Sequence, residues 1–250
     1  MRTLRDFTSA RVDLPTAGNS IATAPLLELR LAHARARDAV HLPLDASSLS
    51  LDFRQRGWPS LVLQSQAKTR DAYLRRPDRG RVLSAESREA LSRFAQSRPF
   101  AFIAADGLSA LAVDRHAAPL LAAVFTRLDY NPDAAHPVFI AQQARVAIGD
   151  VIGECIGAEL AIVLIGERPG LSSPDSLGIY ITWAPRTGRT EAERNCLSNV
   201  HANGLSYEMA AHKLAFLVTE AKRRKLTGVA LKESAGELLS MNNGQRSLSK

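Results

Sequence analysis

Three short polar segments each follow a run of apolar residues and could line a ligand site. They are DGLS (106–109), QQARV (142–146) and GERPGLSS (166–173). Where apolar runs form parallel strands, such segments meet at the carboxyl edge of the sheet, which is where ligands bind. In the third segment, Gly166 and Gly170 let the backbone approach a ligand closely. Glu167 and Arg168 place opposite charges there, and a tight turn with a weak surface ion pair is the alternative interpretation.

The sequence contains no recognised catalytic motif. GxSxG and HExxH are absent, and so are the dinucleotide pattern GxGxxG and the GK[ST] of a phosphate-binding loop. Asp106 and Ser109 could still serve a stand-alone hydrolase, although no histidine base is placed beside them in a recognised arrangement. We keep this hydrolase as one alternative function and assign no catalytic residue.

The histidines and cysteines do not indicate a metal site or a disulfide. His33 and His41 share a stripe on one predicted helix, but their spacing is about 12 Å along a helix, too far to share one metal. Cys155 and Cys196 lie far apart in the sequence and form no disulfide framework. We expect Cys155 to lie mid-helix in the core. Cys196 falls in the polar stretch 186–201, where packing is favoured over a nucleophilic role.

The composition is that of a soluble protein with a sizeable core. The chain has 250 residues, 46% of them hydrophobic, and a formal net charge of +7. No run approaches the ~20 apolar residues of a membrane span, and the N-terminus lacks the apolar segment of a secretory signal. We therefore expect a cytoplasmic protein without a membrane partner. The positive charge leaves a nucleic-acid-binding module as a second alternative function. The basic run 222–225 has a structural explanation, however, because it ends a predicted helix and cations there complement the helix dipole.

Apolar runs alternate with amphipathic segments along the chain. Strands are predicted at 61–65, 100–107, 136–143, 160–167 and 177–185. Helices are predicted at 23–41, 84–95, 109–128, 146–158 and 206–226, the last with a Ser206 cap and an end at Gly228. Strands that are apolar on both faces and alternate with helices predict an α/β fold with a mostly parallel sheet covered on both faces. The tail from Glu233 is polar, which favours a loose segment.

The first eighty residues differ from the rest in their pattern of apolar and polar residues. Thr23 is expected to cap the first helix, in which Leu27 and Leu31 belong to one apolar stripe. The charged turn RRPDRGR (75–81) marks a boundary. We predict two domains, a small helical one at 1–80 and a larger one at 81–250.

Several long segments of the sequence resemble the small subunit of ethanolamine ammonia-lyase. They cover most of residues 6–201 and read DFTSARVDLPTAGNSIAT (6–23), LAHARARDAVH (31–41), YLRRPDRGR (73–81), ADGLSA (105–110), QARVAIGDVIGE (143–154) and IGERPGLSSPDSLGIYITWAPRTGRTEAERNCLSN (165–199). The blocks GERPGLSSPDSLG and ERNCLSN are long and specific to this family. The segment DLPTAG departs from the family's glycine–arginine turn near the start.

The resemblance implies one subunit of an adenosylcobalamin-dependent hetero-oligomer that converts ethanolamine to acetaldehyde and ammonia by a radical mechanism. In that family the large subunit is a TIM barrel that holds the substrate. The small subunit, a Rossmann-like domain preceded by a helical part, covers the cobalamin between the subunits. The cofactor is bound base-on. Asp114, Arg115 and His116 agree with this, because they begin the DxHxxG pattern of an axial histidine but Pro119 replaces its glycine.

The resemblance also implies three cobalamin-binding residues, Val146, Glu167 and Cys196. Val146 would supply backbone and contact surface, the Glu167 carboxylate would accept hydrogen bonds from corrin amides, and Cys196 would be a compact packing group. No metal ligand is implied in this chain. Some relatives carry a longer N-terminal extension that is linked to packaging in a bacterial microcompartment. In this chain the similarity already begins at about residue 6, which does not favour packaging through such an extension.

Overall fold

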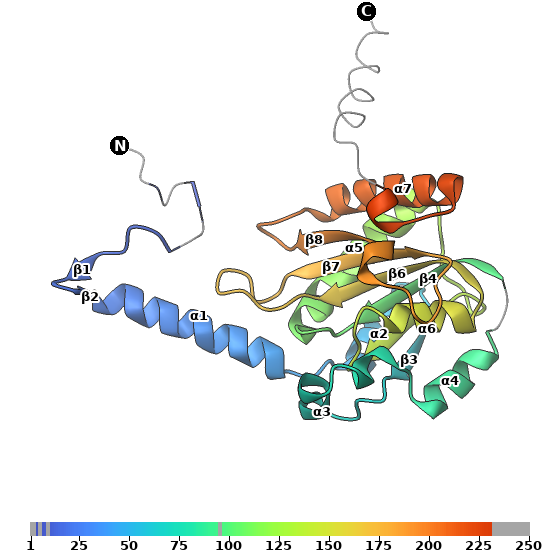
Figure 1. The fold of residues 1–250 in the computed structure, drawn as a ribbon, viewed down its shortest axis with the longest axis horizontal. Helices are drawn as coiled ribbons and strands as arrows, with labels where there is room; N and C mark the ends of the chain where they lie inside the picture. Colours follow the sequence, from blue (N-terminus) through green and yellow to red (C-terminus); the bar gives the residue numbers. More distant parts are fainter. Residues whose placement is uncertain (1–3, 5–6, 9–10, 95–96, 232–250) are drawn as a thin grey trace, which may run out of the picture.

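The computed structural model shows an α/β protein built around one six-stranded sheet (Figure 1). It describes residues 4, 7–8, 11–94 and 97–231. The strands of the sheet are β3 (Ser60–Gln64), β4 (Arg98–Ala105), β5 (Val138–Gln142), β6 (Ala158–Gly166), β7 (Leu177–Trp183) and β8 (Arg194–Val200). The helices are α1 (Thr23–His41), α2 (Ala46–Gln55), α3 (Arg70–Arg75), α4 (Ala85–Ser92), α5 (Ala110–Leu128), α6 (Ile148–Cys155) and α7 (Tyr207–Arg224). A short hairpin, β1 (Thr16–Ala17) and β2 (Ser20–Ile21), precedes α1.

The sheet is mostly parallel, as predicted, and has an antiparallel edge. Its strand order is β3-β5-β4-β6-β7-β8. The first four of these strands pair in parallel, whereas β7 and β8 run antiparallel to their neighbours. No helix separates β6 from β7, so the chain returns as a hairpin rather than as a crossover. The carboxyl ends of β4, β5 and β6 therefore lie side by side at one edge.

Helices cover both faces of the sheet, and alternation along the strands divides the core in two. On β4, Phe100 and Phe102 point into a cluster with α2, α5 and α7, while Ala101 and Ile103 point into a cluster with α4 and α6. All four side chains are buried. Strands that are apolar on both faces are therefore explained by a sheet with two cores.

The N-terminal part differs from the prediction in several details. Helix α1 has the predicted bounds, but Ala22 is its N-cap residue and Thr23 is its first helical residue, so the Thr23 cap was wrong. Leu27 and Leu31 are 57% and 51% exposed, because α1 projects from the body of the protein with its apolar stripe uncovered (Figure 1). Strand β3 lies before residue 80 and yet pairs with β5. The division into two domains stays a prediction.

The structure also contains elements that the sequence reading missed. Helices α2 and α3 lie where no helix was predicted, with Asp45 and Thr69 as their N-cap residues. Strand β8 lies in the polar stretch 186–201, for which no strand was predicted. Helix α7 has the predicted Ser206 cap but ends at Arg224, with Lys225 as a left-handed C-cap residue, before the predicted end at Gly228. The tail from Glu233 lies outside the described residues.

Candidate functional site

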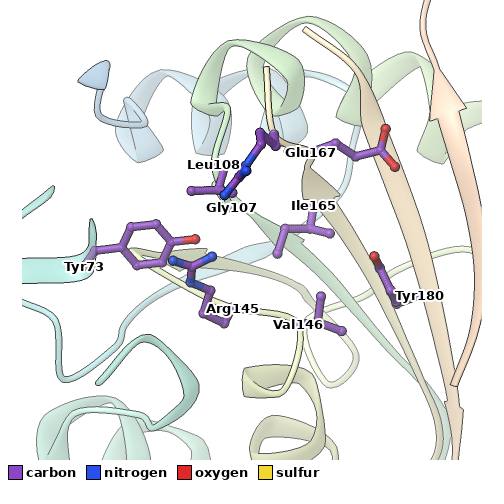
Figure 2. A pocket seen from close by; sticks show the side chains of 10 residues that line it. Tyr73, Gly107, Leu108, Arg145, Val146, Ile165, Glu167 and Tyr180 are labelled. Carbon is purple, nitrogen blue, oxygen red and sulfur yellow. The ribbon is translucent and has the colours of Figure 1, made fainter. Parts of the chain in front are cut away.

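The three polar segments meet at the carboxyl edge of the sheet and line one pocket of about 250 Å³ (Figure 2). Ten residues line it: Tyr73, Gly107, Leu108, Arg145, Val146, Ile165, Gly166, Glu167, Arg168 and Tyr180. They come from the ends of β4, β5 and β6, with Tyr73 of α3 on one side and Tyr180 of β7 on the other. The predicted meeting of these loops at one sheet edge is therefore confirmed.

A buried carboxylate joins two of the loops. Asp106 directly follows β4, is fully buried, and accepts hydrogen bonds from the backbone N–H groups of Gln143 (2.7 Å) and Ala144 (2.9 Å). Gln143 has a φ of 53°, so the carboxylate holds a backbone turn in the left-handed region. Burial raises the pKa of Asp106 to about 6, while the backbone donors and Arg70 oppose the shift. The same turn then presents Arg145 and Val146 to the pocket.

Arg70 connects this turn to more distant segments. Its guanidinium donates to the carbonyl oxygens of Val40 (2.7 Å) and Gly107 (2.8 Å), and lies 3.7 Å from the Asp106 carboxylate. The Arg70 side chain is 9% exposed and lies over the Tyr73 ring, 4.7 Å from its centroid. Through Arg70, the end of α1 is tied to the loops around the pocket.

The Glu167 carboxylate is held by residues of β8 and of the loop before β7. Its Oε2 atom accepts hydrogen bonds from the Ser176 hydroxyl and from the backbone N–H of Asn199 (3.2 Å), and its Oε1 atom accepts one from the Ser198 hydroxyl. Figure 2 shows the carboxylate turned toward the strands on the Tyr180 side of the pocket. Glu167 therefore bonds to these groups and not to Arg168, and the alternative of a surface ion pair was wrong.

Tyr180 brings the third predicted residue close to the pocket. Cys196 does not line the pocket, but it faces Tyr180 across the β7–β8 pair and is hydrogen-bonded to it. Cys196 is exposed, and its polar stretch forms strand β8 here. Desolvation is the main cause that raises the pKa of its thiol. A raised pKa keeps the sulfur protonated, which favours packing over nucleophilic chemistry.

The long loop between β6 and β7 is anchored from α5. The Ser109 hydroxyl donates to the carbonyl oxygen of Pro174 (2.8 Å) and accepts from the N–H of Ala112 as the N-cap of α5. Buried His116 is hydrogen-bonded to the Tyr207 hydroxyl (2.8 Å) and to Asp175 (3.3 Å). Ser109 and Asp106 are thus buried and occupied by structural bonds, which gives the hydrolase alternative no support.

The remaining candidates take ordinary structural roles. His116 lies inside α5, as predicted, and Cys155 is half-buried at the last residue of α6, not mid-helix. In the basic run, Arg223 and Arg224 share the single carboxylate of Glu220, and Lys222 lies 3.9 Å from Glu159. Within the described residues, no group of three or more His, Cys, Asp or Glu side chains could hold a metal ion. Over the same part of the chain, no helix is long and apolar enough to cross a membrane.

Sequence reasoning missed four residues of this site, namely Arg70, Tyr73, Arg145 and Tyr180. Arg145 lies inside the predicted QQARV segment but was given no role. Tyr180 could have been found from its strand, because it alternates with the buried Ile179 and Ile181 and so faces the side of the α6 cluster. Arg70 and Tyr73 carry no local signal, since they reach the pocket only through the tertiary fold.

The fold and the site define an α/β protein whose strand-end loops form a small pocket at the carboxyl edge of the sheet. The model of the ethanolamine ammonia-lyase light chain family matches residues 1–232. The chain is 52% identical to an ethanolamine ammonia-lyase small subunit of Azotobacter vinelandii and 51% identical to one of Ralstonia nicotianae, each over 93% of this chain and 87% of the relative. The chain therefore belongs to the ethanolamine ammonia-lyase small-subunit family, whose members are subunits of a carbon–nitrogen lyase.

Proposed function

We propose that this chain covers one side of an adenosylcobalamin molecule at an interface with the large subunit of ethanolamine ammonia-lyase. The observation that carries the proposal is the convergence of Val146 and Glu167, from two different strand-end loops, on one pocket. Cys196 joins them through Tyr180. The complex is then a cytoplasmic hetero-oligomer, and the substrate site lies in the other subunit.

The size of the pocket supports a shared site. Its volume of about 250 Å³ lies below the ~300–1,000 Å³ of pockets that enclose a small-molecule ligand. A corrinoid is larger than such ligands, so this chain can hold only one part of it and a second chain must cover the rest. The name "small subunit" given to the relatives implies a larger partner.

The chemistry of the lining also fits a corrinoid. Leu108, Val146 and Ile165 give the pocket apolar walls that suit the methyl groups of the macrocycle. A carboxylate has about four acceptor positions, and three on Glu167 are taken, so Oε1 can accept one bond from a corrin amide. Arg145 lines the pocket, and among the described residues its guanidinium forms no ion pair and its Nε atom has no hydrogen-bond partner, so the guanidinium can donate to a ligand.

Adenosylcobalamin, when bound, supplies the radical chemistry, and the residues of this chain hold and shield it. Val146 and Ile165 exclude water from the ring edge, and Glu167 orients an amide arm. Tyr180 carries a pKa raised mainly by burial, so its phenol stays neutral and hydrogen-bonds with Cys196. No acid, base or nucleophile is required from this chain.

The projecting helix α1 is proposed as part of the surface that meets the large subunit. Leu27 and Leu31 are each more than half exposed on it. A continuous apolar stripe on a projecting helix is typical of an interaction surface. In this proposal the residues before about 80 act as the helical N-terminal unit of the subunit.

Co-expression with a large subunit of the family tests the function. The purified complex is expected to give the absorbance spectrum of bound cobalamin after addition of the cofactor and gel filtration, and to deaminate ethanolamine. The chain purified alone is expected to be inactive. A complex that assembles but retains no corrinoid would contradict the proposal.

A further inference from the structure

Two guanidinium groups line the pocket without a carboxylate partner. Arg145 and Arg168 both belong to its lining, and in the part of the chain that the structure describes neither forms an ion pair. The carboxylate in the lining, Glu167, is bound to two hydroxyls and one backbone N–H. The lining therefore holds two guanidinium groups without an ion pair and one carboxylate that accepts from neutral donors, so its net charge is positive.

Arg145 is held in place before any ligand arrives. Its backbone N–H donates to the carbonyl oxygen of Gly80 (2.7 Å), and its guanidinium lies 4.4 Å from the centroid of the Tyr73 ring. Tyr73 is fully buried and its hydroxyl donates to the carbonyl oxygen of Ala144 (3.3 Å), so the ring cannot turn away. In Figure 2 the Arg145 guanidinium lies beside Tyr73 at the pocket. A fixed guanidinium loses little side-chain entropy when it binds a ligand.

Gly80 makes this arrangement sterically feasible. A Cβ at position 80 would lie 3.0 Å from the carbonyl oxygen of Gln143 and 3.0 Å from the Tyr73 ring. The close approach of Gly80 thus fixes both the turn that carries Arg145 and the ring that supports it. The Arg70 guanidinium also lies over this ring, but its charge is offset by Asp106 at 3.7 Å, which leaves Arg145 as the cation without a carboxylate partner.

We propose that Arg145 and Arg168 form an anion subsite that receives the phosphate of the corrinoid's nucleotide arm. This inference rests on the proposed function. Guanidinium groups match phosphate oxygens in geometry and form charge-assisted hydrogen bonds with them. The phosphodiester is the anionic group of cobalamin, whereas the amide arms are neutral. Two unpaired cations therefore select the phosphate end of the molecule.

The experiment compares two corrinoids that differ by one phosphate, cobinamide and cobinamide phosphate. Affinities are measured by absorbance titration of the complex with the large subunit. Arg145→Gln and Arg168→Gln are each expected to weaken cobinamide phosphate about 10-fold or more, as loss of a hydrogen bond to a charged group implies. Cobinamide binding should change less than about 2-fold, since the lost bond involves only the phosphate. Arg223→Gln, an exposed arginine paired with Glu220 on α7, is the matched control.

The outcomes separate this subsite from the proposed function. Equal losses for both corrinoids would overturn the subsite alone, because the arginines would then hold amide arms or acidic residues of the partner. Failure of the unaltered complex to bind any corrinoid would overturn the proposed function and the subsite together. Arg168 lies in the loop between β6 and β7, outside the core, so Arg168→Gln keeps the test decisive if Arg145→Gln does not assemble.

Discussion

The buried carboxylate of Asp106, at the end of β4, accepts a 2.7 Å hydrogen bond from the backbone N–H of Gln143, at the end of β5. This bond joins the ends of two neighbouring parallel strands and holds Gln143 in its left-handed conformation. The next residues along the chain face the pocket. One fully buried acid therefore fixes the geometry of a site that it does not itself line.

We expect Asp106→Asn to loosen the turn at Gln143 and to weaken ligand binding. An amide has one acceptor oxygen where the carboxylate has two, so one of the bonds to Gln143 and Ala144 is lost. A buried N–H left without a partner costs about 1–3 kcal/mol of unfolding free energy. Urea denaturation measures this loss. An unchanged midpoint would show that the turn is held by other contacts.

Asp106 also predicts a pH dependence with a definite sign. Burial raises its folded-state pKa to about 6 from the ordinary value of 3.8, so the folded state binds the extra proton between these values. The contribution of Asp106 to stability is therefore present below pH 3.8 and is lost as pH rises through about 6. The measurement is the unfolding free energy of the unaltered chain minus that of Asp106→Asn, from pH 4 to 7. We expect this difference to decrease as pH rises, and an increase would contradict the prediction.

Glu167→Ala is expected to weaken cobalamin binding to the complex by about 10- to 150-fold, because a hydrogen bond to a charged group contributes about 1.5–3 kcal/mol. Ser198→Ala removes one of the bonds that hold the carboxylate. Its effect should be smaller, about 2- to 12-fold. Titration followed by absorbance gives both values. If Glu167→Ala leaves the affinity unchanged, Glu167 does not contact the ligand.

The meeting of the three loops could be predicted because it follows from chain direction alone. Parallel strands end at the same edge, so DGLS, QQARV and GERPGLSS had to meet wherever β4, β5 and β6 are neighbours. The starts of helices with a side-chain cap, such as those at Ser84 and Ser206, could also be predicted, because the cap is a local hydrogen bond.

The missed parts depend on contacts that are remote in sequence. Strand β8 has few apolar residues, and its position is set by pairing with β7 and by the buried ion pair of Arg194 with Asp150 of α6. The stripe of α1 was correctly read as apolar, but no sequence pattern says whether such a stripe faces the core or a partner. Arg70 reaches Gly107 and Val40 only after the chain has folded.

Cys196 is expected to react slowly with alkylating agents although it is exposed. Desolvation raises the pKa of its thiol, so the thiolate fraction at neutral pH is below that of a free cysteine. Iodoacetamide labelling at pH 7.5, followed by mass spectrometry, gives the rate for Cys196 relative to the denatured chain. Cys155, whose pKa burial also raises, serves as the internal comparison. Labelling of folded Cys196 faster than in the denatured chain would contradict the prediction.

His116 predicts the opposite pH dependence from Asp106. Desolvation is the main cause that lowers its folded-state pKa below the ordinary value of 6.5, in spite of the nearby Asp175. The unfolded chain therefore binds the extra proton, and the stability of the fold decreases as pH falls below about 6.5. His116→Gln should remove this pH dependence, at the cost of the contact that anchors the loop between β6 and β7 through Asp175. Unfolding free energies of the two chains at pH 5.5 and 7.5 measure the effect. If both chains lose the same amount between these values, another group is responsible.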